Sequence, residues 1–420
     1  MTVAGIIAEY NPFHLGHAYH LSEARCLTGA DYVVVVMSGD YVQRGEPALF
    51  DKYTRTRMAL QGGADLVIEL PVAFSTAGSE DFAGGAVAIL DKLGVIDHLV
   101  FGSEAGEIDP VLTAADYLEN ESKETGALIR QGVKDGLSYP TAVSQAFKTA
   151  LLSQEVDDTA LSSLSNMLST PNNLLGVEYC RTLKRRSSSI RPMTIKRLGD
   201  YHETEMDRQM PSASAIRRVF AEHPLSEAFS LIHPAVPSGT YDQMIHESSV
   251  SGPIFTDDFT DALFYRLLNE TEDTLCHYLD VSADLAGRIR NTLPSCHTYT
   301  ELAKAVKCKS YTRLRINRGL IHCLLGLTDE KMTTFKANDY TGYARILGFK
   351  DTAGPLVGEI ASRSSLSLLL RMKEDCEKLS AVDRQLLALN DFSSDLYRMT
   401  AQRKFGHMLP EEYSRRLIRL

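Results

Sequence analysis

The chain has 420 residues, of which 44% are hydrophobic and 23% are charged, and its formal net charge is −10. This composition is that of an ordinary globular protein, long enough for two domains and a sizeable core. The acidic balance argues against strong non-specific binding to nucleic acid. No apolar run approaches the length of a membrane span, so we expect no membrane partner.

The cysteines and the N-terminus indicate the cellular compartment. There are seven cysteines without a C-x-x-C pair, a pattern typical of reduced thiols and not of a zinc site. The N-terminus has no basic region followed by a long apolar region, so we find no secretion signal. We therefore expect a cytoplasmic protein with no metal held by its own residues, and we predict no protein partner.

Residues 1 to about 105 alternate short apolar runs with longer segments of helical character. Strands are predicted at Val3–Glu9, Tyr32–Met37, Leu66–Leu70 and His98–Phe101, and helices at Leu15–Leu27, Lys52–Gln61 and Asp81–Leu93. This alternation is typical of a parallel sheet with helices on both faces. In such sheets the ligand lies beyond the carboxyl ends of the strands, where this chain has its polar clusters.

Helical patterns dominate the rest of the chain. Helices are predicted within residues 107–166, at Leu174–Leu183 and from residue 212 to 218, and a strand at 193–197. The stretch His233–Gly252 is rich in Pro, Ser and Gly, so we place a domain boundary there. The expected fold class is α/β, with a Rossmann-like parallel-sheet domain over residues 1–235 and a mostly α-helical domain over residues 236–420.

Two histidines, His14 and His17, form an H-x-G-H tetrad directly after the first predicted strand. A strand that turns into a helix here directs free N–H groups and the positive helix end at one point, which suits a phosphate. The imidazoles can donate hydrogen bonds to an α-phosphate as its charge develops, and Gly16 leaves room for the approach. The alternative is a pair of ordinary surface or core histidines, which the accompanying strand, turn and helix disfavour.

Several later residues are candidates for nucleotide contacts. The SASAIR segment offers Ser212 and Ser214 at a helix start, with Arg217 as a guanidinium fork for polyphosphate. Gly102 would let the backbone approach adenine or ribose, or it is a simple turn glycine. Asn172 and Asn173 can read the adenine edge or cap a helix, and Arg197 can pair with phosphate or lie on the surface.

The polar loop SGDYVQRGEP follows the second predicted strand. Gln43 and Arg44 could hold a small carboxylate or RNA, since a small carboxylate needs only one cation or a pair of donors. Asp40 could orient a nucleophile or serve as a turn residue.

The tetrad resembles the signature of the nucleotidylyltransferase superfamily, and the longer string GIIAEYNPFHLGHAYHL resembles the bacterial tRNA(Met) cytidine acetate ligase family. Further segments agree in the family's order: SGDYVQRGEPALFDKYTR, GGADLVIELP, PNNLLGVEY, TIKR and SASAIR, with a looser match through YTRLRINR and RILGFK. The loop at Ser38–Asp40 departs from what we expect in many relatives. The resemblance implies a nucleotidylyltransferase-like ATP-binding catalytic domain at 1–235 and a mainly helical, tRNA-binding domain at 236–420.

The resemblance also implies the reaction. ATP and acetate would give acetyl-adenylate and diphosphate, with Mg²⁺ accompanying the ATP. The acetyl group would then pass to N4 of the wobble cytidine (C34) of elongator tRNA(Met), giving N4-acetylcytidine and AMP. The alternative is a small-molecule nucleotidylyltransferase that acts without RNA. A third hypothesis, a non-catalytic RNA-binding protein that keeps a nucleotide site, predicts ATP binding without turnover.

Site residues follow from these arguments together. Catalytic roles are expected for His14, His17, Asp40 and Arg44. The resemblance implies ATP contacts at Ile7, Ala8, Glu9, Tyr10, Asn11, Pro12, Phe13, His14, Leu15, Gly16, His17, Ala18, Tyr19, His20, Gly102, Asn172 or Asn173, and Arg197. The helix start of the SASAIR segment adds Ser212, Ser214 and Arg217. Between the two asparagines we favour Asn173, because it directly precedes the predicted helix.

The charge is unevenly distributed along the second half of the chain. Residues 254–285 contain eight acidic residues and one basic residue, whereas residues 301–350 contain ten basic and four acidic. A local basic patch on an acidic protein can bind RNA selectively, although such runs are commonly solvated helix faces. The expected tRNA contacts are Lys307, Lys309, Arg313, Arg315, Arg318, Arg345 and Lys350, with Tyr311 and Tyr343 available for stacking on bases.

Overall fold

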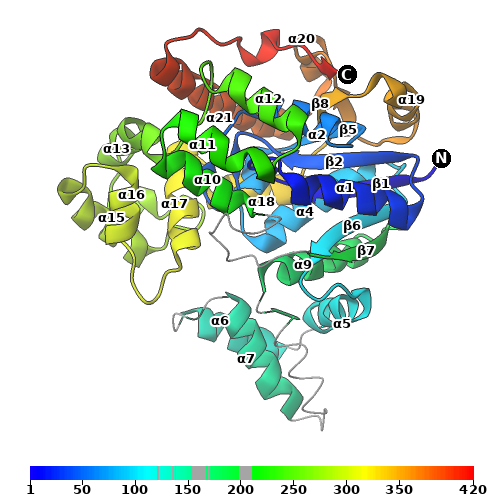
Figure 1. Ribbon diagram of the computed structural model, residues 1–420. Coiled ribbons are helices and arrows are strands. Elements are labelled where there is room, and N and C mark those ends of the chain that lie inside the picture. The colour runs from blue at the N-terminus through cyan, green and yellow to red at the C-terminus, as the bar shows by residue number, and fades with distance from the viewer. Residues whose placement is uncertain (121–122, 135–136, 138, 153–166, 169, 198–210) are drawn as a thin grey trace.

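A computed structural model describes residues 1–120, 123–134, 137, 139–152, 167–168, 170–197 and 211–420 (Figure 1). Helices are predicted within residues 107–166, and the last part of this stretch, residues 153–166, lies outside the described residues. In the described ranges, no helix combines the length and the hydrophobicity that a membrane span requires.

An eight-stranded sheet forms the centre of the molecule, in the order β10-β8-β5-β2-β1-β6-β7 with β9 paired to β8. Its strands are β1 (Val3–Ala8), β2 (Tyr32–Ser38), β5 (Leu66–Leu70), β6 (His98–Ser103), β7 (Arg191–Lys196), β8 (Tyr343–Phe349), β9 (Ser367–Leu369) and β10 (Ile418–Arg419). The strands β5, β2, β1, β6 and β7 are parallel, as predicted. β8 is antiparallel to β5, so the sheet is mixed, which the sequence did not indicate.

Helices cover both faces of this sheet because its central strands are apolar on both sides. Along β2, Val33 and Val35 belong to one buried cluster, whereas Val34 and Val36 belong to another. The first cluster contains residues of α1 (Leu15–Thr28), α2 (Lys52–Gln61), α10 (Ala213–Glu222), α11 (Leu225–Ile232) and α12 (Ser238–Glu247). The second contains residues of α3 (Val72–Ser75), α4 (Ser79–Lys92), α5 (Ile108–Glu119) and α9 (Pro171–Arg185).

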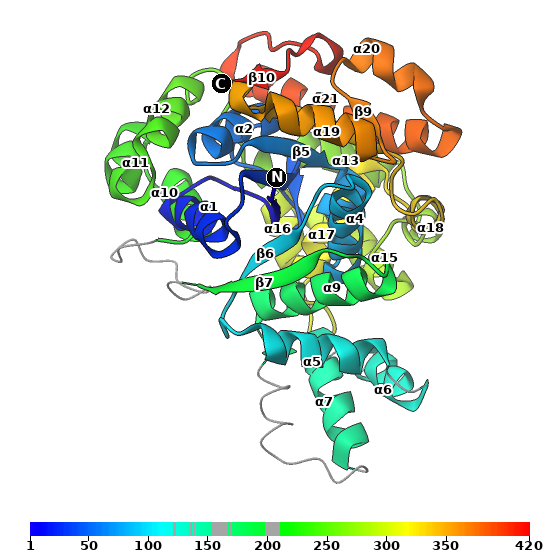
Figure 2. The same cartoon turned by 90° about the vertical axis from the view of Figure 1, so that its right-hand side faces the viewer.

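The predicted elements of the first half are confirmed, with shifts of a few residues at their ends. The helix at Lys52–Gln61 and the strand at Leu66–Leu70 have the predicted bounds. After α5 come α6 (Lys123–Lys134) and α7 (Tyr139–Leu152), which pack against each other and project from the body in both views (Figures 1 and 2). A short hairpin of β3 (Tyr41–Val42) and β4 (Glu46–Pro47) follows β2.

The stretch His233–Gly252 is not a linker, because it contains the 3₁₀ turn η1 (His233–Ala235) and α12. Beyond it the chain is mainly helical, as predicted. The helices are α13 (Thr260–Leu268), α14 (Glu272–Leu275), α15 (Ala283–Thr292), α16 (Tyr299–Ala305), α17 (Arg313–Leu325), α18 (Asp329–Ala337), α19 (Gly354–Arg363), α20 (Met372–Asp375) and α21 (Ala381–Phe405). Further 3₁₀ turns are η2 (Thr256–Phe259), η3 (Leu293–Ser295), η4 (Asp351–Ala353), η5 (Cys376–Lys378) and η6 (Glu412–Ser414). Because β8, β9 and β10 return to the sheet, residues on both sides of position 235 share one sheet.

Candidate active site

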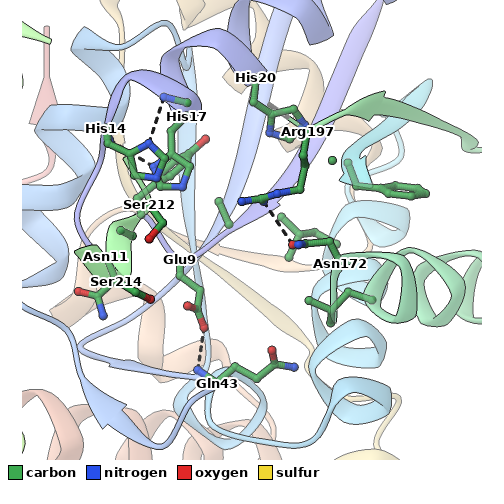
Figure 3. Close-up of a pocket in the computed structure, with 18 of the residues that line it drawn as sticks. Glu9, Asn11, His14, His17, His20, Gln43, Asn172, Arg197, Ser212 and Ser214 are labelled. Atoms are coloured by element: carbon green, nitrogen blue, oxygen red, sulfur yellow. Dashed lines mark hydrogen bonds between the residues drawn. The ribbon is translucent and has the colours of Figure 1, made fainter. Parts of the chain in front are cut away.

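A cavity lies beyond the carboxyl ends of β1, β6 and β7, where the fold rule for parallel sheets expects a ligand (Figure 3). Its lining includes these expected residues: Ile7, Ala8, Glu9, Tyr10, Asn11, His14, Gly16, His17, Tyr19, His20, Arg44, Gly102, Asn172, Arg197, Ser212, Ser214 and Arg217. Pro12, Phe13, Leu15 and Ala18 belong to the same turn and helix but do not line the cavity. The sequence motifs therefore converge on one site from six separate segments.

The two tetrad histidines are held in one tautomer by backbone N–H groups. The N–H of Gly16 donates to His14 Nδ1 at 3.0 Å, and the N–H of His14 donates to His17 Nδ1 at 3.3 Å. A ring nitrogen that accepts carries no proton, so each neutral imidazole has its N–H at Nε2. The rings stack with centroids 3.8 Å apart, and a side chain at Gly16 would lie 2.9 Å from the His14 ring.

Burial keeps these imidazoles neutral. It lowers the pKa of His14 to about 3, with the positive charges of Arg197 and Arg217 adding to the effect. Burial likewise lowers the pKa of His17 well below its usual range and that of His20 to about 4. At neutral pH, His14 and His17 are thus neutral hydrogen-bond donors at the N-terminus of α1, which is suited to binding an anion.

Glu9 follows β1 and meets the polar loop after β2. Its Oε1 accepts a hydrogen bond from the Gln43 N–H at 2.8 Å. Beneath it, the fully buried Arg55 donates through Nη1 to the carbonyls of Glu9 (2.6 Å) and Ser38 (3.0 Å), and through Nη2 to the carbonyl of Gly39. One guanidinium therefore ties together the carboxyl ends of β1 and β2.

The start of α10 forms one wall of the cavity. Ser212 is the N-cap, and its Oγ accepts from the Ala215 N–H at 3.1 Å. Arg217 donates to the Asn11 carbonyl at 2.7 Å and to Ser214 Oγ at 3.2 Å. This contact brings the SASAIR segment, about 200 residues away in sequence, directly onto the tetrad turn.

The opposite wall carries Arg197 and Asn172 (Figure 3). Arg197 Nη1 donates to Asn172 Oδ1 at 3.3 Å, and Asn172 Nδ2 donates to Glu104 Oε1 at 2.6 Å. Asn173 is buried, and its Oδ1 accepts from the N–H of Glu104 at 2.9 Å. The cavity is therefore lined by Asn172 and not by Asn173, so our preference for Asn173 was wrong.

The cavity also has an apolar wall, which was not predicted from the sequence. Phe101, Leu175 and Tyr179 line the cavity beside Gly102, together with Phe82 and Ile195. Such a surface suits a planar aromatic base. Each of these residues fits a core-facing position of a strand or helix, and the one signal for a second role was their proximity to Gly102 and to the asparagine pair.

Asp40 does not line this cavity. It is 4% exposed, its Oδ1 accepts from the Lys52 N–H at 2.8 Å, and its Oδ2 lies 3.9 Å from Lys52 Nζ. Lys52 Nζ also contacts Glu69 Oε1 at 2.8 Å and Glu412 Oε1 at 2.6 Å. Asp40 thus belongs to a buried ion cluster that supports the loop, and the structure corrects its predicted catalytic role.

The expected tRNA contacts fall into two groups. Lys307, Lys309 and Arg313 are exposed at and before the N-terminus of α17, and Arg315 is half-buried on the same helix, over the ring of Tyr311. Arg318, also on α17, is half-buried and pairs with Asp280. A Cβ atom at Gly45 would clash with the backbone nitrogen of Arg318. The hairpin that carries Arg44 therefore packs directly on α17.

The other two basic residues lie elsewhere. Arg345 is 3% exposed and bound to Glu412 at 2.6 Å, so its predicted contact with tRNA is wrong. Lys350 follows β8 and lies 3.7 Å from Asp65. Because Phe349 pairs with Leu66 at the start of β5, Lys350 lies at the sheet edge opposite the cavity. Tyr311 and Tyr343 are buried and present no free face for stacking on a base.

Comparison with known proteins places this site in a family. Residues 1–411 match the model of the HIGH Nucleotidyl Transferase family. Two relatives named tRNA(Met) cytidine acetate ligase, from Acetivibrio thermocellus and Lysinibacillus sphaericus, are 36% and 33% identical, and each match covers 100% of both chains. A third with the same name, from Thermoanaerobacter sp., is 37% identical over 95% of both.

The fold of the chain is also found in solved structures. The crystal structure of Thermotoga maritima TmcAL bound with alpha-thio ATP matches with a TM-score of 0.91 and 29% identity, covering 100% of both chains. Its apo form matches with a TM-score of 0.92 over the same coverage. The resemblance read from the tetrad and its flanking segments is thereby confirmed. The chain belongs to the tRNA(Met) cytidine acetate ligase family of the HIGH nucleotidyl transferases.

Proposed function

We propose that this protein is an ATP-dependent ligase that acetylates N4 of the wobble cytidine of elongator tRNA(Met). The observation that carries the proposal is the pair of neutral imidazoles, His14 and His17, with their Nε2–H groups free of the backbone bonds that occupy Nδ1. They stand at a helix start in a cavity that also presents Arg197 and Arg217. The names of the full-length relatives supply the substrate.

In the first step, an acetate oxygen attacks the α-phosphorus of ATP, and the bond to diphosphate breaks. His14 and His17 donate hydrogen bonds to the α-phosphate oxygens, on which charge develops in the transition state. The helix start at Ser212 and the Arg217 guanidinium receive the β- and γ-phosphates. Gln43 and Arg44, which line the cavity beside Glu9, hold the acetate.

The adenosine lies against the apolar wall, with Gly102 allowing close approach and Asn172 offering its amide. In the second step, the N4 amine attacks the acyl carbon and AMP leaves. Mg²⁺ would arrive on the ATP phosphates, since no cluster of His, Cys, Asp and Glu among the described residues could cage it. We place the enzyme in the cytoplasm, because its cysteine pattern is typical of reduced thiols.

The RNA approaches over the N-terminal end of α17. Lys307, Lys309, Arg313 and Arg315 give this end a positive surface, and the helix contacts the hairpin whose tip carries Arg44. A tRNA bound to these residues would thus reach the cavity from the side where the acetate is held.

The test uses [14C]acetate, ATP and Mg²⁺, with and without unmodified elongator tRNA(Met), followed by digestion of the RNA to nucleosides. Label in N4-acetylcytidine is expected. His17→Ala should lower acetate-dependent release of diphosphate by about 10²–10³-fold, the usual loss of one transition-state donor. His246→Ala, at an exposed histidine of α12, is the matched control.

The alternative small-molecule nucleotidylyltransferase predicts diphosphate release with another acid or nucleotide and no label in RNA. Activity of His17→Ala equal to that of the control would remove the tetrad from the mechanism altogether.

A further inference from the structure

Glu9 has a position in the cavity that ATP binding does not explain. Among the described residues that line the cavity, it is the one carboxylate, and Figure 3 shows it below the histidine pair, between Asn11 and Gln43. A carboxylate beside a triphosphate repels it, so its presence at the acyl end of the cavity calls for a different role.

The second step of the proposed reaction needs a proton acceptor. The exocyclic N4 of cytidine carries two hydrogens, and one must leave as the amide bond forms. AMP departs as an anion and needs no proton, so the proton from N4 must go to a base at the acyl carbon.

The histidines of the described lining, and two of its tyrosines, are unsuited to this role. In His14 and His17 the acceptor nitrogen Nδ1 is already bonded to a backbone N–H. His20 Nε2 and the Tyr10 hydroxyl are buried atoms that are not exposed at the cavity surface. Burial raises the pKa of Tyr179 far above neutrality, so its hydroxyl is protonated.

Glu9 has the geometry of a base. The Gln43 N–H fixes one carboxylate oxygen, Oε1, at 2.8 Å, whereas Oε2 accepts no hydrogen bond from the described residues. Burial raises the pKa of Glu9 above its usual value, opposed by the Gln43 N–H and by Arg44, Arg217 and Arg55. The carboxylate is therefore a stronger base than one in water, and Arg55 holds its backbone in place.

We propose that Glu9 is the catalytic base of acetyl transfer, which takes the proton from N4 of the cytidine through Oε2. This inference rests on the proposed function. The N4 lone pair forms the C–N bond, the C–O bond to the phosphate of AMP breaks, and the N4 proton moves to Glu9, which later releases it to water. No step of adenylation requires this base, because acetate attacks as an anion.

The test separates the two half-reactions with Glu9→Gln, which keeps the size and the ability to accept from Gln43. Acetyl transfer from synthetic acetyl-adenylate to tRNA(Met) is measured in single turnover, and adenylation is measured as acetate-dependent exchange between ATP and diphosphate. The rate of transfer should fall about 10²–10⁴-fold. This loss should exceed the loss in the rate of exchange by more than about tenfold. Glu107→Gln, at an exposed glutamate before α5, is the control.

A pH profile distinguishes a base from a structural residue. In the wild type, transfer should slow as the pH is lowered through the pKa of Glu9, because a protonated carboxyl cannot accept; this limb should be absent in Glu9→Gln. Equal losses in transfer and exchange, or the same slowing of transfer at low pH in the wild type and in Glu9→Gln, would overturn the role of Glu9 but leave the proposed function standing. A wild type that labels no cytidine would overturn the proposed function and this inference together.

Discussion

Replacing Lys52 with Met should destabilise the protein strongly, because the side chain is fully buried among carboxylates. Its ammonium contacts the carboxylates of Glu412 at 2.6 Å, Glu69 at 2.8 Å and Asp40 at 3.9 Å. Arg345 is the second cation that touches these groups, at 2.6 Å from Glu412 and 3.4 Å from Glu69. In the wild type two cations face these three buried carboxylates, and after the change only Arg345 remains. Removing one partner of a buried pair costs about 3–5 kcal/mol.

The charge states of the cluster predict how this loss depends on pH. Burial would raise the pKa of Glu412, but Lys52 and Arg345 outweigh it and lower the pKa to about 2. This lowered pKa stabilises the fold above the pKa of the unfolded chain, and the stabilisation is lost as the pH falls toward 2. Burial raises the pKa of Asp40 to about 6 even with Lys52 working against it. Without Lys52, these carboxylates take up protons at higher pH, so the deficit should shrink from about pH 8 to about pH 5.5.

The assay is urea unfolding followed by circular dichroism at both pH values, since the chain has no tryptophan to report by fluorescence. Lys184→Met is the matched control, because Lys184 is 46% exposed and pairs with an exposed Asp116. Such a surface pair contributes about 0–1 kcal/mol. A Lys52→Met deficit as small as that of the control, or one that does not change with pH, would refute this account of the cluster.

Three further predictions concern the site and its surroundings. Arg197→Ala should weaken ATP binding by about 1.5–3 kcal/mol in isothermal titration, the usual contribution of a hydrogen bond to a charged group, and unchanged affinity would exclude Arg197 from the nucleotide site. Gly45→Ala should lower both the stability and the rate of diphosphate release more than Gly406→Ala does. The backbone strain is similar at the two glycines, since φ is +70° at Gly45 and +75° at Gly406, but only at Gly45 would a Cβ lie within 2.8 Å of the α17 backbone. The triple change of Lys307, Lys309 and Arg313 to Ala should weaken all tRNAs alike and reduce the slope of log affinity against log salt by about 2–3 in filter binding, whereas an unchanged slope would place the RNA elsewhere.

Local signals in the sequence were sufficient for the tetrad and its surroundings. His14 and His17 stand between an apolar strand and a capped helix, and both the strand and the turn are determined within about fifteen residues. Gly102 and Arg197 were predicted because parallel strands bring their carboxyl ends to one edge. The alternation of strand and helix therefore predicted the edge of the sheet at which the cavity lies.

The errors concern residues whose environment depends on distant segments. Asp40 is polar and follows a strand, like the true lining residues, but its partners Lys52 and Glu412 bury it. Arg345 was read with a basic run, whereas its strand joins the sheet beside residues almost 280 positions earlier. No local pattern reports such pairings.

The asparagine pair shows a finer limit. Asn172 and Asn173 both lie in the first turn of α9, which begins at Pro171. Successive residues of a helix point about 100° apart, so an uncertainty of one residue in the helix start exchanges the side chain that faces the cavity.

The pairing of β5 with β8 has a consequence for the synthesis of this protein. Leu70 ends β5 and Tyr343 begins β8, so 343 − 70 = 273 positions separate the two edges that must meet. At roughly 5–20 residues per second, a ribosome needs about 14–55 s to cover this distance. During that time β5 is an apolar strand with an open edge on the nascent chain. We expect newly made chains to depend on a chaperone that covers this edge, and to aggregate when translation stalls between the two strands.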